Sequence, residues 1–391
     1  MAELMKSGKS DTVITANFQF MSGHAFNKVD NIVYERIVVV YQQNFLHETK
    51  VYILLHLSVM KGMKTYINSQ IVREKMNYAG VVKRPFLFAV DFEMESGLFV
   101  DDPLNQNEVL FRVGDIKNFT GTFISPNESL LKIKDLIRYA EYSEKFDIVM
   151  TGLRRGDTYL INLTAKTEIE TSLTLRKILC ATESQFGICA WEDFVSFSPE
   201  RFVRIENGII SSCPMKGTID ASIPNAGEII LKDYKESCEH NTIVDLIRND
   251  LGKVSGRVWV ERFKYIDKIE TDRGDILQVS SDIRGELPVG YGNNLGDIIF
   301  SMFPAGSVSG APKSSTLRLI SKAEGEKRGF YTGVFGYFDG TVLDSAVLIR
   351  FIEKKSEGSM FYHSGGGITV NSVCKDEYEE LITKIYLPLK K

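Results

Sequence analysis

The chain has 391 residues, of which 43% are apolar and 25% are charged, and its formal net charge at pH 7 is −4. This length and composition are typical of a globular protein with one large domain or two medium ones. The charge balance indicates no basic surface for a nucleic acid, and the longest apolar stretch, 51–60, is too short to cross a membrane.

The cysteines and the first residues point to the cellular compartment. There are five cysteines, an odd number, without CxxC spacing and without paired histidines nearby. This pattern argues against a zinc site and against a disulfide framework, and it suits a reducing compartment. The first residues carry no apolar run after their charges, so no secretory signal is expected. The sequence therefore predicts a cytoplasmic protein.

The first segment, residues 1–62, differs in character from the rest. It contains three of the five histidines and no clear turn signals, although 37–44 and 51–58 could be two strands of a hairpin. From Met63 the apolar spacing is that of a helix ending at Gly80. We expect 1–62 to be an extension, disordered or preceding the natural start, and 63–391 to be the functional domain. The alternative is a small element packed on that domain.

Strands and helices follow in separate runs. The predicted strands are 84–93, 156–169, several segments within 188–214 broken by Ser-Pro and Asn-Gly, and about four within 330–370. The predicted helices are 129–147, 172–183, a long one within 227–254 ending near Gly252, one after the loop 303–315, and 375–389. Because hairpins rather than alternating helices join the strands, we expect an α+β fold with large antiparallel sheets.

Lys216, in the segment CPMKGT, is the first candidate catalytic residue. It is expected between a strand and a tight turn, where half-burial would lower the pKa of its amine and make it a nucleophile. Glu200, in FSPERF, precedes an Asn-Gly turn, and a hairpin would bring its carboxylate near this amine as a general acid or base. The alternatives are a surface lysine and an edge-strand charge.

The last predicted helix carries a second cluster. Glu377, Glu380 and Lys384 are spaced at i, i+3 and i+7, so they share one face. Two neighbouring carboxylates suit Mg²⁺ that bridges to an anionic substrate, and Glu239 on another helix is a possible further ligand. The alternative is a solvated face with a Glu380–Lys384 ion pair.

Two glycine-rich segments and one arginine complete the candidates. The loop 303–315 leads into a helix and could bind an anion through backbone N–H groups, although its spacing is not that of a Walker A loop. The segment 364–370 is expected between two strands, where its glycines approach a carboxylate or form a turn. Arg350, within an apolar strand, is expected to pair with a carboxylate or to bury its stem at a sheet edge. Together these residues indicate an enzyme that acts on a small polycarboxylate.

From about Met63 to its end, the chain resembles the chorismate-utilising enzymes, and most closely the aminodeoxychorismate synthase component I branch of p-aminobenzoate and folate biosynthesis. The resemblance covers more than half of the chain and rests on ordered motifs: SPERF, CPMKGT, EHNTIVDLIRNDLG, FPAGSVSGAPK, GFYTGVFGY, VLIRF, SGGGI and DEYEEL…K. It implies a fold with two large antiparallel sheets packed as a sandwich and helices outside.

The resemblance also implies roles for individual residues. Lys216 resembles the lysine that attacks the chorismate ring and displaces the 4-hydroxyl, where anthranilate and isochorismate synthases usually carry alanine. Glu200 resembles the general acid and base, and Glu239, Glu377 and Glu380 resemble the Mg²⁺ ligands. The positions similar to substrate-anchoring residues are Thr218, Gln278, Tyr337, Arg350, Gly366, Gly367 and Lys384.

Two departures and one absence refine this expectation. Gln278 stands where many relatives have a histidine that contacts the departing hydroxyl, so Glu200 would carry more of the acid work. Leu160 stands where isochorismate and salicylate synthases usually place a water-activating lysine, which leaves ammonia as the nucleophile. The chain shows no glutaminase motif, so the resemblance implies a glutamine amidotransferase subunit on a separate chain. The alternatives are anthranilate synthase component I and a non-catalytic, anion-binding regulatory protein.

Overall fold

The computed structural model describes residues 66–123, 130–269 and 275–389, together with the backbone of four strands in the first 57 residues. The internal contacts of the chain divide it into two units, Met1–Lys64 and Thr65–Lys391. The first unit contains one antiparallel sheet made of β1 (Glu3–Lys6), β2 (Thr12–Ala16), β3 (Tyr34–Gln43) and β4 (Thr49–Leu57). The two segments expected to form a hairpin, 37–44 and 51–58, overlap β3 and β4, which pair antiparallel; positions 44 and 58 lie outside the described residues. The role of 1–62 stays a prediction.

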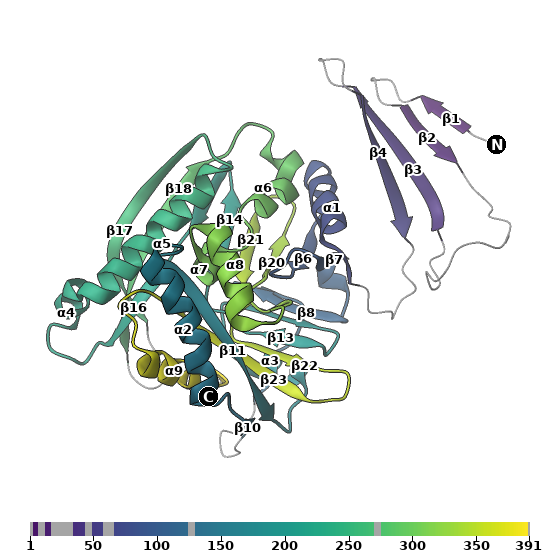
Figure 1. The fold of residues 1–391 in the computed structure, drawn as a ribbon. Coiled ribbons are helices and arrows are strands. Elements are labelled where there is room, and N and C mark those ends of the chain that lie inside the picture. Colours follow the sequence, from purple (N-terminus) through teal and green to yellow (C-terminus); the bar gives the residue numbers. More distant parts are fainter. Residues whose placement is uncertain are drawn as a thin grey trace. The chain divides into compact units, whose positions relative to one another are not determined.

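The second unit contains two large antiparallel sheets, as Figure 1 shows, and this confirms the expected fold class. The nine-stranded sheet has the order β10 (Lys132–Asp135), β11 (Leu160–Glu170), β23 (Met360–Ile368), β22 (Phe351–Lys354), β13 (Phe194–Ser196), β12 (Phe186–Ala190), β8 (Val109–Val113) and β9 (Ile116–Lys117), with β19 (Gly310–Ala311) paired to β11. The ten-stranded sheet has the order β16 (Met215–Asp220), β18 (Ile276–Glu286), β15 (Ile209–Ser212), β14 (Arg201–Glu206), β21 (Leu343–Val347), β20 (Val334–Phe338), β6 (Phe86–Val90), β7 (Ser96–Asp101) and β5 (Ile67–Asn68), with β17 (Arg257–Ile269) paired to β18.

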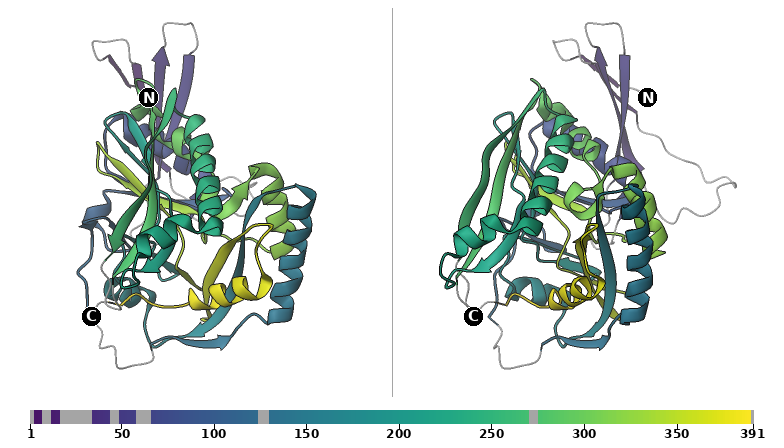
Figure 2. Two further views of the ribbon diagram at one scale, coloured as in Figure 1. Left: turned by 90° about the vertical axis from the view of Figure 1, so that its left-hand side faces the viewer. Right: turned by 60° about the vertical axis from the view of Figure 1, so that its left-hand side comes forward.

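Helices cover the outer faces of these sheets, as the two views of Figure 2 show. They are α1 (Ser69–Val81), α2 (Tyr139–Arg155), α3 (Leu175–Ala181), α4 (Ala226–Lys232), α5 (Tyr234–Gly252), α6 (Leu295–Ser301), α7 (Gly306–Ser309), α8 (Lys313–Glu324) and α9 (Cys374–Thr383), with 3₁₀ turns η1 (Pro103–Asn105) and η2 (Tyr291–Asn294). None of the helices in the described residues has both the length and the apolar character needed to traverse a bilayer.

The alternation of side chains along the strands explains the layers. In β6, Phe88 and Val90 belong to the core beneath α1 and α6, whereas Leu87 and Ala89 belong to the core between the two sheets. Successive residues of a strand point to opposite faces, so a fully apolar strand is buried on both sides. The core between the sheets takes residues from both of them, among which Phe335 of β20 is fully buried.

Several local expectations are wrong. The predicted helix 129–147 begins only at Tyr139, because Lys132–Asp135 forms an exposed edge strand, β10, that pairs with β11. The helical segment within 227–254 is divided into α4 and α5 at Asp233, which caps the second helix by accepting a hydrogen bond from the backbone of Glu236. Local apolar spacing did not reveal these breaks, because strand pairing and capping decide them.

Candidate active site

A pocket opens between the nine-stranded sheet and the elements α5, α7 and β16. It encloses about 1240 Å³, including the space open to solvent. Its lining contains these residues singled out from the sequence: Leu160, Glu200, Lys216, Arg350, Gly366, Gly367 and Lys384. These residues lie on segments far apart in the chain, so the pocket exists only when the two sheets are assembled.

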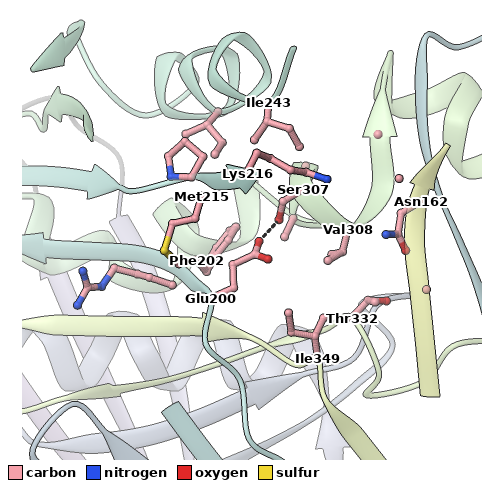
Figure 3. A pocket seen from close by; sticks show the side chains of 18 of the residues that line it. Asn162, Glu200, Phe202, Met215, Lys216, Ile243, Ser307, Val308, Thr332 and Ile349 are labelled. Atoms are coloured by element: carbon pink, nitrogen blue, oxygen red, sulfur yellow. Dashed lines mark hydrogen bonds between the residues drawn. The ribbon is translucent and has the colours of Figure 1, made fainter. Parts of the chain in front are cut away.

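Lys216 lies within β16 rather than between a strand and a turn. The pairing of β16 with β18 shifts its register between Lys216 and Thr218, and the residue between them, Gly217, has a φ of 76°. A bulge of this kind redirects the strand, and glycine adopts such a φ at little cost. Figure 3 shows that the Lys216 side chain points into the pocket. Its Nζ lies 3.3 Å from Oε2 of Glu239 on α5.

The expected lowering of the Lys216 pKa is wrong for the protein as it stands. Burial lowers the pKa of this amine, but the negative charges of Glu239, Glu380 and Glu236 outweigh burial and raise the pKa above its ordinary value. The side chain is 31% exposed, so its desolvation is incomplete. Lys216 therefore rests as an ammonium ion and must lose a proton before it can attack a substrate.

Glu200 lies immediately before β14 and enters the pocket opposite Lys216, as Figure 3 shows. Burial raises the pKa of its carboxyl group, and this effect is partly offset by a hydrogen bond from Ser307 and by the charges of Lys216 and Lys384. The Ser307 hydroxyl, on α7, donates to Oε1 of Glu200. A raised pKa makes this carboxyl group a better proton acceptor than an ordinary glutamate, and the protonated acid can then return the proton.

Ser307 was missed by the sequence reasoning. It lies in the segment 303–315, which was expected to bind an anion through its backbone. In the structure this segment forms α7 and β19 before α8 begins, and its serine hydroxyl contacts a protein carboxylate instead. The only sequence signal for this role was a serine hydroxyl within the glycine-rich loop 303–315.

Glu377 and Glu380 of α9 and Lys384, the residue that follows this helix, share one face, as their spacing predicts. A β-carbon added to Gly366 would lie 3.4 Å from Oε2 of Glu377, 3.7 Å from Oε1 of Glu380 and 3.8 Å from Nζ of Lys384. Lys384 also pairs with Glu380 at 2.6 Å and donates to the carbonyl oxygen of Gly365 at 2.8 Å. The helix therefore presents these groups to the glycine-rich strand.

The glycine-rich segment 364–370 does not form the turn that was one of its two expected roles; residues up to Ile368 belong to β23. It pairs with β11, where Gly366 lies opposite Leu163 and Gly367 opposite Asn162. A β-carbon on Gly367 would lie 3.8 Å from Nζ of Lys216. The glycines thus leave room for a ligand between the amine of Lys216 and the charged face of α9.

The predicted Mg²⁺ ligands fit this cation in their chemistry. Glu239, Glu377 and Glu380 offer only carboxylate oxygens, which Mg²⁺ prefers. Within 66–123, 130–269 and 275–389, however, no three His, Cys, Asp or Glu side chains converge closely enough to hold a metal ion. Glu239 and Glu380 instead hold the ammonium groups of Lys216 and Lys384. If Mg²⁺ binds here, Glu239 and Glu380 would hold it in place of these lysine partners, together with Glu377.

Arg350 lies between β21 and β22, and not within a strand as was expected. Its φ is 51°, its Nη1 donates to the carbonyl oxygen of Lys384 at 2.9 Å, and its guanidinium lies 4.8 Å from the centre of the Tyr386 ring. None of the ion pairs seen among the described residues involves Arg350. Because it lines the pocket, its guanidinium is available to an anionic ligand.

Three predicted substrate positions do not contribute to the pocket lining formed by the described residues. Thr218 is exposed in β16, beyond the bulge, and lies opposite Gln278 of β18. Tyr337 is 4% exposed and packs in the core between the sheets, 5.1 Å from the ring of Phe111. The tyrosines that line the pocket are Tyr331 and Tyr362. The roles of Thr218, Gln278 and Tyr337 therefore rest on the resemblance alone.

Comparison with known proteins bears on the chemistry of this pocket. The chain matches the profile of the chorismate binding enzyme family over residues 120–390. It is 45% identical over 321 residues to an uncharacterized PabA-like protein of Haemophilus influenzae. The aligned region covers 81% of this chain and 96% of that protein. It is 31% identical over 261 residues to aminodeoxychorismate synthase component 1 of Bacillus subtilis. This aligned region covers 63% of this chain and 54% of that protein.

Among solved structures, anthranilate synthase component I from Streptococcus pneumoniae is similar, with a TM-score of 0.54 and 26% sequence identity. The similarity covers 67% of this chain and 61% of that one. The segment 120–390 that matches the family profile contains all the residues that line the pocket.

Proposed function

The chain belongs to the chorismate-binding enzyme family, and from this premise we propose that it is an aminodeoxychorismate synthase component I. The reaction converts chorismate and ammonia to 4-amino-4-deoxychorismate. The observation that carries the proposal is the amine of Lys216, which enters the same pocket as Glu200 and faces the glycines of β23. A lysine in this place provides a nucleophile that the alanine of anthranilate synthases lacks.

The proposed reaction begins with a proton transfer. The carboxylate of Glu200 accepts a proton from the Lys216 ammonium, and the neutral amine bonds to the chorismate ring. The bond from the ring to the 4-hydroxyl breaks, and the oxygen leaves as water with the proton from Glu200. Ammonia then bonds to the carbon that lost the hydroxyl, and the electron pair of the ring–nitrogen bond returns to Lys216. The covalent intermediate divides one difficult displacement into two easier ones.

The remaining residues would bind and orient the substrate. Arg350, with its guanidinium at the pocket wall, suits a carboxylate of chorismate, and the glycines Gly366 and Gly367 allow the ring to approach. Mg²⁺ held by Glu239, Glu377 and Glu380 would supply positive charge that fixes and polarises the other carboxylate. Leu160, an apolar residue of the lining, offers no group to activate water, which favours ammonia.

Incubation with chorismate, Mg²⁺ and an ammonium salt, followed by chromatography and mass spectrometry, tests the proposal. A product that retains the enolpyruvyl group and gains an amino group supports it. Release of pyruvate with formation of anthranilate would instead support an anthranilate synthase component I. Binding of chorismate without any turnover would indicate a regulatory, anion-binding protein. Addition of a glutamine amidotransferase subunit with glutamine, in place of ammonium, tests the predicted partner.

Glu380→Ala is expected to impair Mg²⁺-dependent turnover more than it impairs folding. The variant loses one of the carboxylates beside Gly366, so the Mg²⁺ concentration for half-maximal activity should rise by about 10-fold or more. The side chain of Glu380 is 50% exposed, so the melting temperature should change little. Glu379→Ala, on the same helix and 63% exposed, is the matched control and should leave the Mg²⁺ dependence unchanged. Equal Mg²⁺ titrations of the two variants would contradict the assignment.

A further inference from the structure

A buried ion pair lies directly behind one wall of the pocket. It joins Glu324, the last residue of α8, to Arg328, which precedes β20. The two side chains are 3% and 2% exposed, respectively. The contact is bidentate: Nε of Arg328 donates to Oε2 of Glu324 at 2.8 Å, and Nη2 donates to Oε1 at 2.6 Å.

The remaining donors of this guanidinium bind residues of the pocket wall. Nη1 of Arg328 donates to the carbonyl oxygen of Val308 at 2.8 Å and to Oγ1 of Thr332 at 3.3 Å, and Nη2 donates to the carbonyl oxygen of Asn162 at 2.7 Å. Asn162, Val308 and Thr332 all line the pocket, and Figure 3 shows them around one end of it. One buried cation thus joins three separate segments of the wall.

Stability alone does not explain this arrangement. Two buried charges lose their hydration, and a well-packed apolar pair of similar size is often as stable. What a guanidinium adds is a planar set of donors with fixed directions, which a lysine or an apolar residue cannot reproduce. The geometry of the wall is therefore what this ion pair specifies.

The wall segment held by Arg328 carries a hydroxyl of the proposed active site. Val308, whose carbonyl accepts from Arg328, directly follows Ser307, which donates to Glu200. We propose that Arg328 is a positioning residue that sets the Ser307 hydroxyl against the carboxyl group of Glu200. This inference deepens the proposed function and rests on it for the kinetic consequence, although the positioning itself concerns only the protein's own groups.

The first test needs no substrate. The titration of Glu200 can be followed by ¹³C NMR of the protein labelled at its glutamate carboxyl groups, with the Glu200 resonance assigned through Glu200→Gln. The hydrogen bond from Ser307 lowers the pKa of Glu200. The charges of Lys216 and Lys384 also lower it, and they are present both in the wild-type protein and in a Ser307 variant. Ser307→Ala should therefore raise the titration midpoint. Arg328→Lys, which keeps the charge beside Glu324 but loses the fixed donors, should raise it in the same direction.

The second test is a double-mutant cycle that measures the rate of chorismate consumption. This rate can be measured whichever product the protein forms. Arg328→Lys should lower kcat by about 10-fold with a smaller change in KM. The reason is that Arg328 positions Ser307, whose hydroxyl contacts Glu200, the proposed acid and base of the reaction. In the Ser307→Ala background the same substitution should lower kcat by less than about 2-fold, since the hydroxyl that Arg328 positions is already absent. Arg112→Lys is the matched control: it is also a buried arginine bound to carbonyl oxygens, of Thr182 and Ser184, away from the pocket.

The outcomes separate the two proposals. An unchanged Glu200 titration in Arg328→Lys, or an equal loss of kcat in both backgrounds, overturns the positioning role and leaves only a structural one. A wild-type protein that does not consume chorismate overturns the proposed function, while the Glu200 titration still decides the positioning. If Arg328→Lys does not fold, Glu324→Gln takes its place in both tests, because it loosens the hold on the same guanidinium without shortening any side chain.

Discussion

Replacement of Lys216 by alanine is expected to abolish formation of 4-amino-4-deoxychorismate while the fold stays intact. The proposed reaction has no route that bypasses the amine, so the rate should fall by a factor on the order of 10³ to 10⁶, as is typical when an enzyme nucleophile is removed. The side chain is 31% exposed, so its truncation leaves no large cavity. Steady-state turnover with ammonium as the nitrogen source, together with circular dichroism, measures both quantities.

Intact-protein mass spectrometry gives this prediction its sharpest form. With chorismate and Mg²⁺ but no ammonia, the wild-type chain should gain the mass of chorismate less one water, and peptide mapping should place it on Lys216. Lys216→Ala should gain nothing. Lys253→Ala is the matched control, because Lys253 also pairs with a carboxylate, Asp250, but does not line the pocket. Product formation by Lys216→Ala at the parent rate would rule out the covalent route.

Glu200→Gln is expected to slow formation of this adduct by roughly 10²- to 10⁴-fold, the usual contribution of a general acid–base group. Glutamine keeps the shape and can accept the hydrogen bond from Ser307, but it cannot accept a proton from Lys216. The effect should therefore fall on the rate of adduct formation rather than on the affinity for chorismate. Rapid-quench mass spectrometry without ammonia measures this rate directly.

The pH dependence of adduct formation tests the direction of the pKa shifts of Glu200 and Lys216. The resting pair, a Glu200 carboxylate and a Lys216 ammonium, carries as many protons as the reactive pair, a Glu200 acid and a Lys216 amine. The rate in the wild-type protein should thus be constant between the two pKa values. It should fall at low pH through the raised pKa of Glu200 and at high pH through the raised pKa of Lys216. In Glu200→Gln the low-pH decline assigned to Glu200 should be absent; an unchanged decline would assign it to another group.

Local sequence patterns were enough to predict much of the fold. The runs of strands joined by Asn-Gly and Asp-Gly turns indicate antiparallel sheets, since a short turn can join only neighbouring antiparallel strands. The spacing of Glu377, Glu380 and Lys384 likewise predicts their common face on α9, because helical geometry depends only on neighbours in the chain. Local patterns failed where pairing with a distant strand decided the structure, as at β10 and at the glycines of β23.

By itself the sequence determined the α+β class, the family motifs and the presence of a lysine, a glutamate and an acidic helix that could form a site. Only the tertiary structure decided the charge of that lysine, because Glu239 and Glu380 approach it from α5 and α9 and outweigh its burial. Only the tertiary structure paired Ser307 with Glu200 and turned Tyr337 toward the core between the sheets. Electrostatic and packing effects depend on distances in space between segments remote in sequence, and no local pattern records those distances.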